Sequence, residues 1–202
     1  MSITKSDLNN MDERYRAKLI NSVSGYKSAN LIGSIDDAGQ TNLAVVSSVV
    51  HLGANPPLLG VVFRPHSVSR HTLENILTTE RYTINHINQH ITEQAHQTSA
   101  RYAKEQSEFD ATGLSEEFID DFSAPFVKES VIKLAMHYKA HQTLALNGTV
   151  FVIGEIMALH LPPELIGDDG HVDLVAAGSV CINGLDGYYN PSLIARYPYA
   201  KP

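Results

Sequence analysis

The sequence has one cysteine, Cys181, and no tryptophan among its 202 residues. A single thiol cannot form an intramolecular disulfide, and this suits a reducing compartment. Basic residues are also scarce: 15 lysines and arginines stand against 22 acidic residues, for a net charge of −7. They are scattered along the chain, whereas a nucleic-acid-binding surface needs a basic stripe. We therefore expect no nucleic acid among the partners.

Long apolar segments are missing as well. The N-terminal residues MSITKSDLNNMDER have no apolar stretch behind their lysine, so they do not look like a secretory signal. The most apolar window, residues 43–63, is interrupted by two serines, a histidine and two prolines, and it cannot be a membrane span. These absences predict a cytoplasmic protein with no membrane partner.

Several catalytic and nucleotide-binding motifs are absent. The sequence contains no G-x-G-x-x-G after a strand, no G-x-x-x-x-G-K-[ST] and no G-x-S-x-G. Cys181 lies in the apolar run 174–182 and is interpreted as a core residue rather than a nucleophile. No dedicated catalytic residue is therefore predicted.

Histidines are numerous, ten in all, but their spacing does not indicate a metal site. Two pairs are four residues apart, His86 with His90 and His137 with His141. Neither pair lies in an H-E-x-x-H or cysteine-rich context, so we expect surface histidines and no metal.

The length and composition fit one domain over residues 1–202, and the periodicity predicts that it is mainly β. Residues 132–141 alternate apolar and polar side chains, which predicts one buried face and one wet face. Asn147-Gly148 then predicts a hairpin whose return strand covers 149–160. Further strands are expected over 29–35, 41–46, 58–63 and 81–86. Long paired strands with few helices predict a closed antiparallel barrel rather than a parallel sheet.

The predicted helices are peripheral. One starts near Asn10 and Glu13, and its apolar stripe of Met11, Tyr15 and Leu19 is expected to pack on the body of the protein. Others are expected to begin at Thr72 and to cover 87–102 and 115–121.

The stretch from residue 40 to residue 76 gathers groups that suit a phosphate. A strand ends in Ser47 and Ser48, the next ends in Arg64, and a polar loop leads to the helix at Thr72. The loop contains Ser67, Ser69 and Arg70. A helix start offers free N–H groups and arginine offers a planar pair of donors. The simpler alternative is a serine-capped helix beside two solvated arginines.

The order of several motifs resembles the flavin reductase-like, FMN-binding split-barrel family across residues 15–190. The motifs are Asn42 followed by Ser47-Ser48, NPPLLGVVFRP at 55–65, HTLENI at 71–76, SEFDATGL at 107–114 and Asp186-Gly187-Tyr188-Tyr189. The resemblance implies an antiparallel split β-barrel that forms a homodimer with FMN near the subunit boundary.

The resemblance also implies roles for individual residues. Arg64, Arg70 and Thr72 would hold the FMN phosphate, with Ser67 and Ser69 as further candidates. Asn42, Ser47 and Ser48 would meet the ribityl chain or the polar edge of the flavin ring. Many relatives carry an aromatic residue where this chain has Ser48, and Tyr188 or Tyr189 is expected to compensate.

Three functions follow from the resemblance. The first is an oxidoreductase that reduces flavin with NADH or NADPH and passes electrons to an oxygenase or another acceptor. A nicotinamide could stack on the flavin, which fits the missing glycine fingerprint. The second is an FMN-binding electron carrier with little turnover, similar to flavoredoxin. The third is a split-barrel protein whose site has been turned to some other ligand, or a flavin-binding protein with another role.

Overall fold

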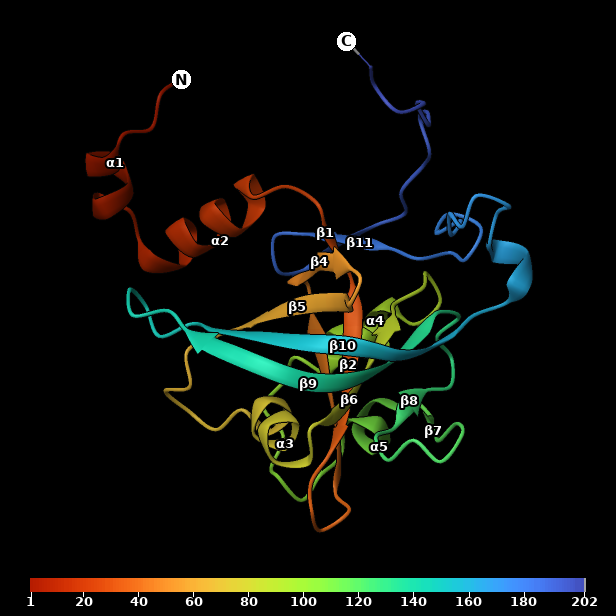
Figure 1. Cartoon of the computed structure of the whole chain (residues 1–202). Helices are drawn as coiled ribbons and strands as arrows, with labels where there is room; N and C mark the ends of the chain where they lie inside the picture. The colour runs from red at the N-terminus through yellow and green to blue at the C-terminus, as the bar shows by residue number, and fades with distance from the viewer. Residues whose placement is uncertain (202) are drawn as a thin grey trace.

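A single antiparallel sheet of seven strands dominates the computed structural model, which describes residues 1–201 and leaves Pro202 outside (Figure 1). Its strand order is β3-β2-β6-β9-β10-β5-β4. The strands are β2 Asn30–Ile35, β3 Thr41–Val46, β4 Val49–Ala54, β5 Pro57–Phe63, β6 Arg81–His86, β9 Lys133–Thr143 and β10 Val150–His160. The predicted mainly-β, antiparallel class is confirmed.

The remaining elements are short and lie around this sheet. Two smaller sheets consist of β1 Lys27–Ser28 with β11 Cys181–Asn183 and β12 Gly187–Tyr189, and of β7 Glu116–Glu117 with β8 Phe126–Val127. The helices are α1 Lys5–Asn10, α2 Glu13–Val23, α3 His71–Thr79, α4 Thr92–Gln97, α5 Glu108–Thr112 and the 3-10 turn η1 Pro163–Leu165. Within residues 1–201, no helix combines the length and apolar character needed to cross a membrane.

The barrel is split rather than closed, because β3 and β4 form the two ends of the strand order and do not pair with each other. The chain leaves β3, bends at Ser47 and Ser48, and enters β4, which pairs with β5. The Ser48 hydroxyl donates to the Val62 carbonyl at 2.7 Å, and the Val62 N–H donates to the Ser48 carbonyl at 3.4 Å. This corner directs β4 away from β3. The predicted closed barrel is therefore wrong, whereas the predicted split barrel is confirmed.

Burial along β9 departs from the predicted alternation. Residues 133–136 are buried on both faces, whereas residues 139–143 are exposed on both. The sheet has a core on each side, as β2 illustrates: Leu31 belongs to one apolar cluster and Ile32 to the other. Leu134 and Met136 of β9 belong to the cluster that contains Ile32, whereas Lys133 contacts the segment 115–131. The far half of β9 continues as a projecting hairpin with β10 (Figure 1). Burial along β9 therefore depends on which part of the strand the rest of the protein covers, and not on the alternation of apolar and polar side chains.

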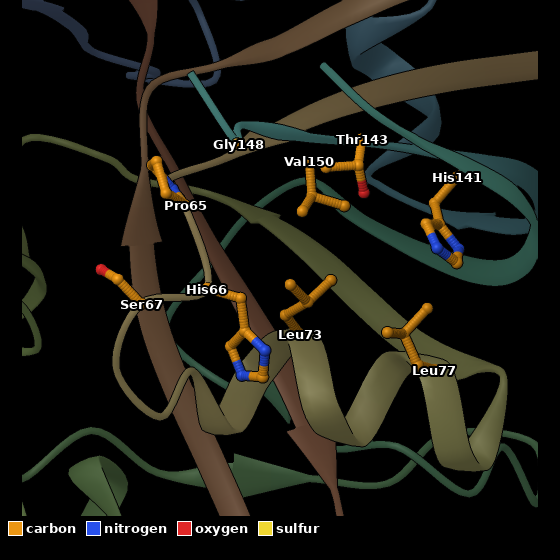
Figure 2. Close-up of a pocket in the computed structure, with 9 residues that line it drawn as sticks. All are labelled: Pro65, His66, Ser67, Leu73, Leu77, His141, Thr143, Gly148 and Val150. Atoms are coloured by element: carbon orange, nitrogen blue, oxygen red, sulfur yellow. The ribbon is translucent and has the colours of Figure 1, made fainter. Parts of the chain in front are cut away.

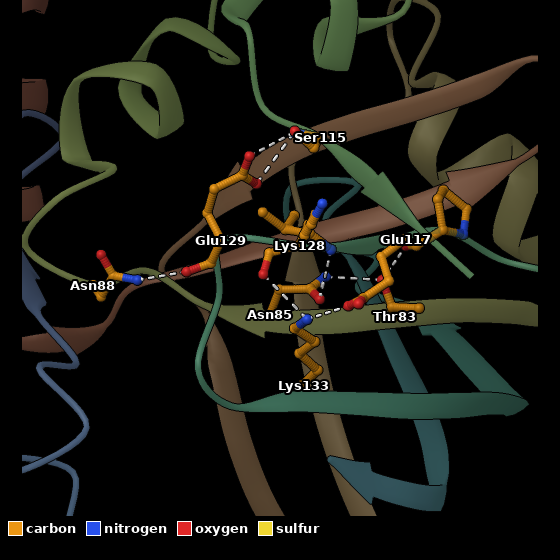
Figure 3. Close-up of polar contacts among 10 residues, drawn as sticks. Thr83, Asn85, Asn88, Ser115, Glu117, Lys128, Glu129 and Lys133 are labelled. Carbon is orange, nitrogen blue, oxygen red and sulfur yellow. Dashed lines mark hydrogen bonds and ion pairs between the residues drawn. The ribbon is translucent and has the colours of Figure 1, made fainter. Parts of the chain in front are cut away.

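Buried polar contacts attach the segment 115–131 to the sheet (Figure 3). The Lys133 ammonium, on β9, donates to the Glu117 carboxylate. The Asn85 side chain, on β6, accepts the Val127 N–H at 3.0 Å. Buried polar groups need partners inside the protein, so these contacts fix the outer segment over the start of β9.

The helix predicted over 115–121 is wrong. β7 lies there instead, and Asp120 and Asp121 have positive φ angles of 50° and 58°, which an α-helix cannot contain. The helix occurs earlier, as α5, where Ser107 caps its start and Gly113, with φ of 75°, ends it.

The helix predicted over 87–102 is also mostly wrong, because only α4 is helical. The Ile87 N–H donates to the Ala29 carbonyl at 3.1 Å, and the Ile87 carbonyl accepts the Val180 N–H at 3.0 Å. These pairings with distant strands prevent a helix from starting at Ile87.

The N-terminal helix forms but does not pack as predicted. α2 begins after Asp12, whose side chain accepts the Tyr15 N–H at 3.0 Å, and not at Asn10. None of its residues is buried, and Tyr15 is 62% exposed. Figure 1 shows α1 and α2 projecting from the same side of the barrel as the C-terminal tail. The expected packing of the apolar stripe on the body is therefore wrong within one chain.

His86 is an exception to the expectation that the histidines lie on the surface. Its Nδ1 lies 3.2 Å from the Ser179 hydroxyl, and burial lowers the pKa of its ring from 6.5 to about 4. The histidine is therefore neutral in the folded protein at neutral pH.

We predict that His86 makes the protein less stable in acid. The unfolded chain binds the proton first, so this contribution is complete above pH 6.5 and is lost as the pH falls toward 4. At about pH 5 the loss in unfolding free energy should be about 2 kcal/mol. Urea unfolding at pH 7 and at pH 5 measures it. His86→Gln should remove this part of the pH dependence, whereas the exposed control His90→Gln should retain it. Equal pH dependence in wild type and His86→Gln would contradict the prediction.

Candidate functional site

A cavity of about 1000 Å³ opens beside β3, at the end of β5 and the start of α3. The structure brings seven of the eight predicted site residues into its lining: Asn42, Ser47, Ser48, Arg64, Ser69, Arg70 and Thr72. They come from two segments of the chain, 42–48 and 64–72, which the fold brings together at one cavity.

Ser67 is the predicted residue that lies elsewhere. It lines a smaller hollow of about 480 Å³ between α3 and the β9–β10 hairpin, together with His66 and His141 (Figure 2). Pro65 borders both hollows, so the loop 64–70 separates them. The geometry therefore does not group Ser67 with the other seven residues.

The start of α3 forms one end of the larger cavity. Arg70 is the N-cap residue, and no side chain caps the helix. The alternative of a helix capped by Ser67 or Ser69 is therefore wrong. The Glu74 carboxylate accepts the Arg70 N–H at 2.9 Å, which fixes the approach to the helix. The N–H groups of the first turn have no partners within a helix and remain available to an anion.

Arg70 and Arg64 supply the positive charge at this end. The Nε atom of Arg70 is buried and has no hydrogen-bond partner, and Arg64 is exposed. Within residues 1–201, neither arginine forms an ion pair with a carboxylate. A buried N–H without an acceptor costs about 1–3 kcal/mol, so the side chain is arranged for an acceptor that the chain itself does not supply.

The neutral polar residues differ in what they can offer. The Asn42 amide donates to the Thr72 hydroxyl at 2.8 Å, so this buried pair joins β3 to α3. The Thr72 proton is free to donate to a ligand. The Ser48 proton is already used on the Val62 carbonyl, so Ser48 can act only as an acceptor.

The sequence pattern does not predict a second wall of the cavity, separate from the loop 64–70. This wall consists of residues 96–102 and Glu108. It seals the free edge of β3, where the Leu43 N–H donates to Glu108 and the Val45 N–H donates to Thr98, each at 2.9 Å. Burial raises the pKa of the Glu108 carboxyl. These contacts join residues more than 50 positions apart, so no local period or motif could reveal them.

The two tyrosines expected to replace an aromatic residue do not line the cavity. Tyr188 packs edge-on against His96 with ring centroids 5.8 Å apart, and His96 does line the cavity. Tyr189 packs instead against Tyr26 at 5.0 Å. Tyr188 therefore supports the wall from behind. In residues 1–201 there is no group of three or more histidine, cysteine or acidic side chains placed to hold a metal ion.

Residues 25–177 match the family model described as "Flavin reductase like domain". The match covers more than half of the chain, and the chain therefore belongs to this flavin reductase-like family. The predicted family is confirmed, and with it the general class of flavin-related oxidoreductases.

Solved structures agree with this assignment. A candidate flavin reductase with a split-barrel domain from Shewanella frigidimarina is 56% identical, with 99% of this chain and 100% of that chain covered and a TM-score of 0.96. Nitrilotriacetate monooxygenase component B from Bacillus cereus is 18% identical, with 98% of each chain covered and a TM-score of 0.85. Flavoredoxin of Desulfovibrio vulgaris (Miyazaki F) is 19% identical, with 87% and 92% covered and a TM-score of 0.74. The last two show the fold alone.

Proposed function

We propose that this protein binds FMN in the larger cavity and reduces flavin with NADH or NADPH, passing electrons to an oxygenase or another acceptor. We also propose that it is a single cytoplasmic domain. The observation that carries the proposal is the end of the cavity at α3, where a buried, unpartnered Arg70 Nε lies beside free helix N–H groups. This donor set suits a phosphate dianion.

The residues present fit FMN in a particular arrangement. Arg64, Arg70, Ser69 and Thr72 would hold the phosphate, and Asn42, Ser47 and Ser48 would meet the ribityl chain or the polar edge of the ring. Ser48 would accept a hydrogen bond there, because its proton is engaged by Val62. Ser67 drops out of the proposed site because it faces the smaller hollow.

The bound flavin would supply the hydride chemistry, and the protein would bind and orient the reactants. A nicotinamide that stacks on the flavin needs no dinucleotide-binding domain of its own, which fits the missing glycine motifs. The name of the Bacillus cereus relative, a monooxygenase component, supports an oxygenase as the acceptor.

The second candidate function is an electron carrier with little turnover. The likeness to a flavoredoxin favours it, although that likeness extends to the fold only. A carrier and a reductase would both be yellow when loaded with FMN, so colour alone cannot separate them.

Turnover separates the two functions. We expect purified protein to absorb in the flavin bands after addition of FMN, and to oxidise many equivalents of NADH or NADPH when free FMN is in excess. A carrier would consume about one equivalent per site. A protein that binds no flavin at all would contradict both functions.

We also propose that the protein is a homodimer. α2 has no buried residue, and an isolated helix of its 11 residues is marginal in water. The C-terminal tail exposes further apolar side chains, among them Leu193 at 64% and Ile194 at 96%. Both elements project on one side of the barrel, where a second copy could cover them (Figure 1).

We therefore predict a species of twice the 22.1 kDa chain mass in sedimentation at micromolar concentration. Replacing the exposed Ile194 and Leu193 by serine should weaken association, because burial of each leucine or isoleucine contributes about 1.5–3 kcal/mol. The control is Leu146→Ser, at the tip of the β9–β10 hairpin, where the residue is 99% exposed. A wild-type protein that sediments only as a 22.1 kDa species would contradict the prediction.

A further inference from the structure

The cavity holds a third arginine that the phosphate end does not use. Arg64 and Arg70 belong to the loop 64–70, whereas Arg101 belongs to the separate wall formed by residues 96–102. Three of the seven arginines in the sequence thus line one cavity, in a protein whose net charge is −7. Two separate segments of the chain therefore contribute positively charged side chains to the cavity.

The wall that carries Arg101 is attached to β3 shortly before that residue. The buried Thr98 hydroxyl accepts the Val45 N–H at 2.9 Å and donates to the Ala95 carbonyl at 2.8 Å. Within the wall itself, the Tyr102 hydroxyl accepts the Gln97 amide at 2.9 Å. The contact with β3 therefore holds the segment that carries Arg101 beside the cavity.

No acidic group of the chain uses Arg101. It is exposed, and within residues 1–201 it forms no ion pair. Two carboxyl groups also line the cavity, those of Glu108 and Asp186. Glu108 is engaged by the Leu43 N–H at 2.9 Å, and burial favours its neutral form by raising its pKa. The guanidinium remains free for an anion that enters the cavity.

We propose that Arg101 binds a phosphate group of a ligand in this cavity, acting from a different segment than Arg64 and Arg70. This inference rests on the proposed function and extends it to the wall formed by residues 96–102. The phosphate has two sources, the FMN phosphate itself or a phosphate of the nicotinamide dinucleotide that shares the cavity. A planar guanidinium suits either, because it donates two parallel hydrogen bonds to phosphate oxygens.

The test compares wild type with Arg101→Ala, Arg101→Lys and the control Arg81→Ala, which removes a partly exposed arginine at the start of β6, outside the cavity and outside α2. Dissociation constants are measured by fluorescence quenching for FMN and riboflavin, and by calorimetry for NAD⁺ and NADP⁺ with the FMN-loaded protein. Arg101→Ala should weaken at least one phosphate ligand by about 10-fold or more. Arg101→Lys should recover part of that loss, because it keeps the charge without the planar pair of donors.

The pattern of losses identifies the source. A loss for FMN without a loss for riboflavin assigns the flavin phosphate. A loss for NADP⁺ alone assigns the extra phosphate of that dinucleotide, and equal losses for NAD⁺ and NADP⁺ assign their shared diphosphate. Unchanged affinities for all four ligands in Arg101→Ala would overturn the inference alone. A wild type that binds neither flavin would overturn the proposed function together with it.

Discussion

Arg70→Ala is expected to weaken FMN binding by about 10- to 150-fold while leaving riboflavin binding almost unchanged. The arginine lies at the N-cap of α3, and its buried Nε has no acceptor within residues 1–201. A charge-assisted hydrogen bond to a phosphate oxygen contributes about 1.5–3 kcal/mol, and riboflavin has no phosphate. The ratio of the two affinities therefore isolates the phosphate contact.

Fluorescence quenching of both flavins by wild type and variant measures this ratio. Arg81→Ala again provides an arginine-to-alanine control outside the cavity. The unfolding free energy of ligand-free Arg70→Ala should fall by no more than about 1 kcal/mol, because the side chain forms no ion pair to lose and its unpartnered Nε is removed. Equal losses for FMN and riboflavin would mean that the phosphate lies elsewhere, and Arg64 would then be the next residue to test.

We expect Gly154→Ala to lower the free energy of unfolding by about 3 kcal/mol, which is the upper end of the usual range for substitutions that overpack a core. Gly154 lies on β10 directly against Tyr82 of β6. An added Cβ would lie 2.0 Å from the Tyr82 hydroxyl oxygen and 3.3 Å from the His137 carbonyl oxygen. The Tyr82 ring is fully buried and cannot swing away without disturbing the core.

The Tyr82 hydroxyl makes this clash testable by a double-mutant cycle. It is buried without a hydrogen-bond partner, so Tyr82→Phe alone should cost little or should stabilise the protein. In the double variant, removal of the oxygen should restore most of the stability lost in Gly154→Ala. A small residual loss should remain, because the ring carbon that carries the hydroxyl would still lie 3.0 Å from the new Cβ.

Urea unfolding of the four proteins gives the coupling free energy. Gly167→Ala is the matched control, since its added Cβ would lie 3.1 Å from the exposed Asp169 side chain and at an ordinary contact distance of 3.6 Å from the His171 carbonyl oxygen. That variant should change stability by less than about 0.5 kcal/mol. Additive effects of Gly154→Ala and Tyr82→Phe would show that the hydroxyl is not the obstacle.

The elements that sequence could predict are those fixed by local chemistry. The hairpin between β9 and β10 follows from alternation and from Gly148, whose φ of 73° the turn requires. The start of α3 near Thr72 follows from the polar loop before it. β4 has no such local signal: its residues VVHLGA do not alternate, and its place is determined by pairing with β5.

The residues of the site also divide into those that the sequence could predict and those that it could not. The phosphate end lies within one continuous stretch, from Arg64 to Thr72, so its residues could be proposed together. Ser67 could not be excluded, because the direction of a loop side chain depends on how the loop folds between two hollows. The wall carrying Arg101 and Glu108 approaches β3 through contacts with the strand edge, and sequence separation hides such contacts.

Two backbone amides at the free edge of β3 should show, through their hydrogen exchange, when the cavity wall moves. The Leu43 and Val45 N–H groups donate to side chains of Glu108 and Thr98 rather than to another strand. Movement of the wall alone would release them to solvent while the sheet stays folded. In deuterium exchange these two amides should therefore open at a lower free energy than their neighbours in β2. A ligand that holds the wall in place would slow the exchange of both amides without contacting either one.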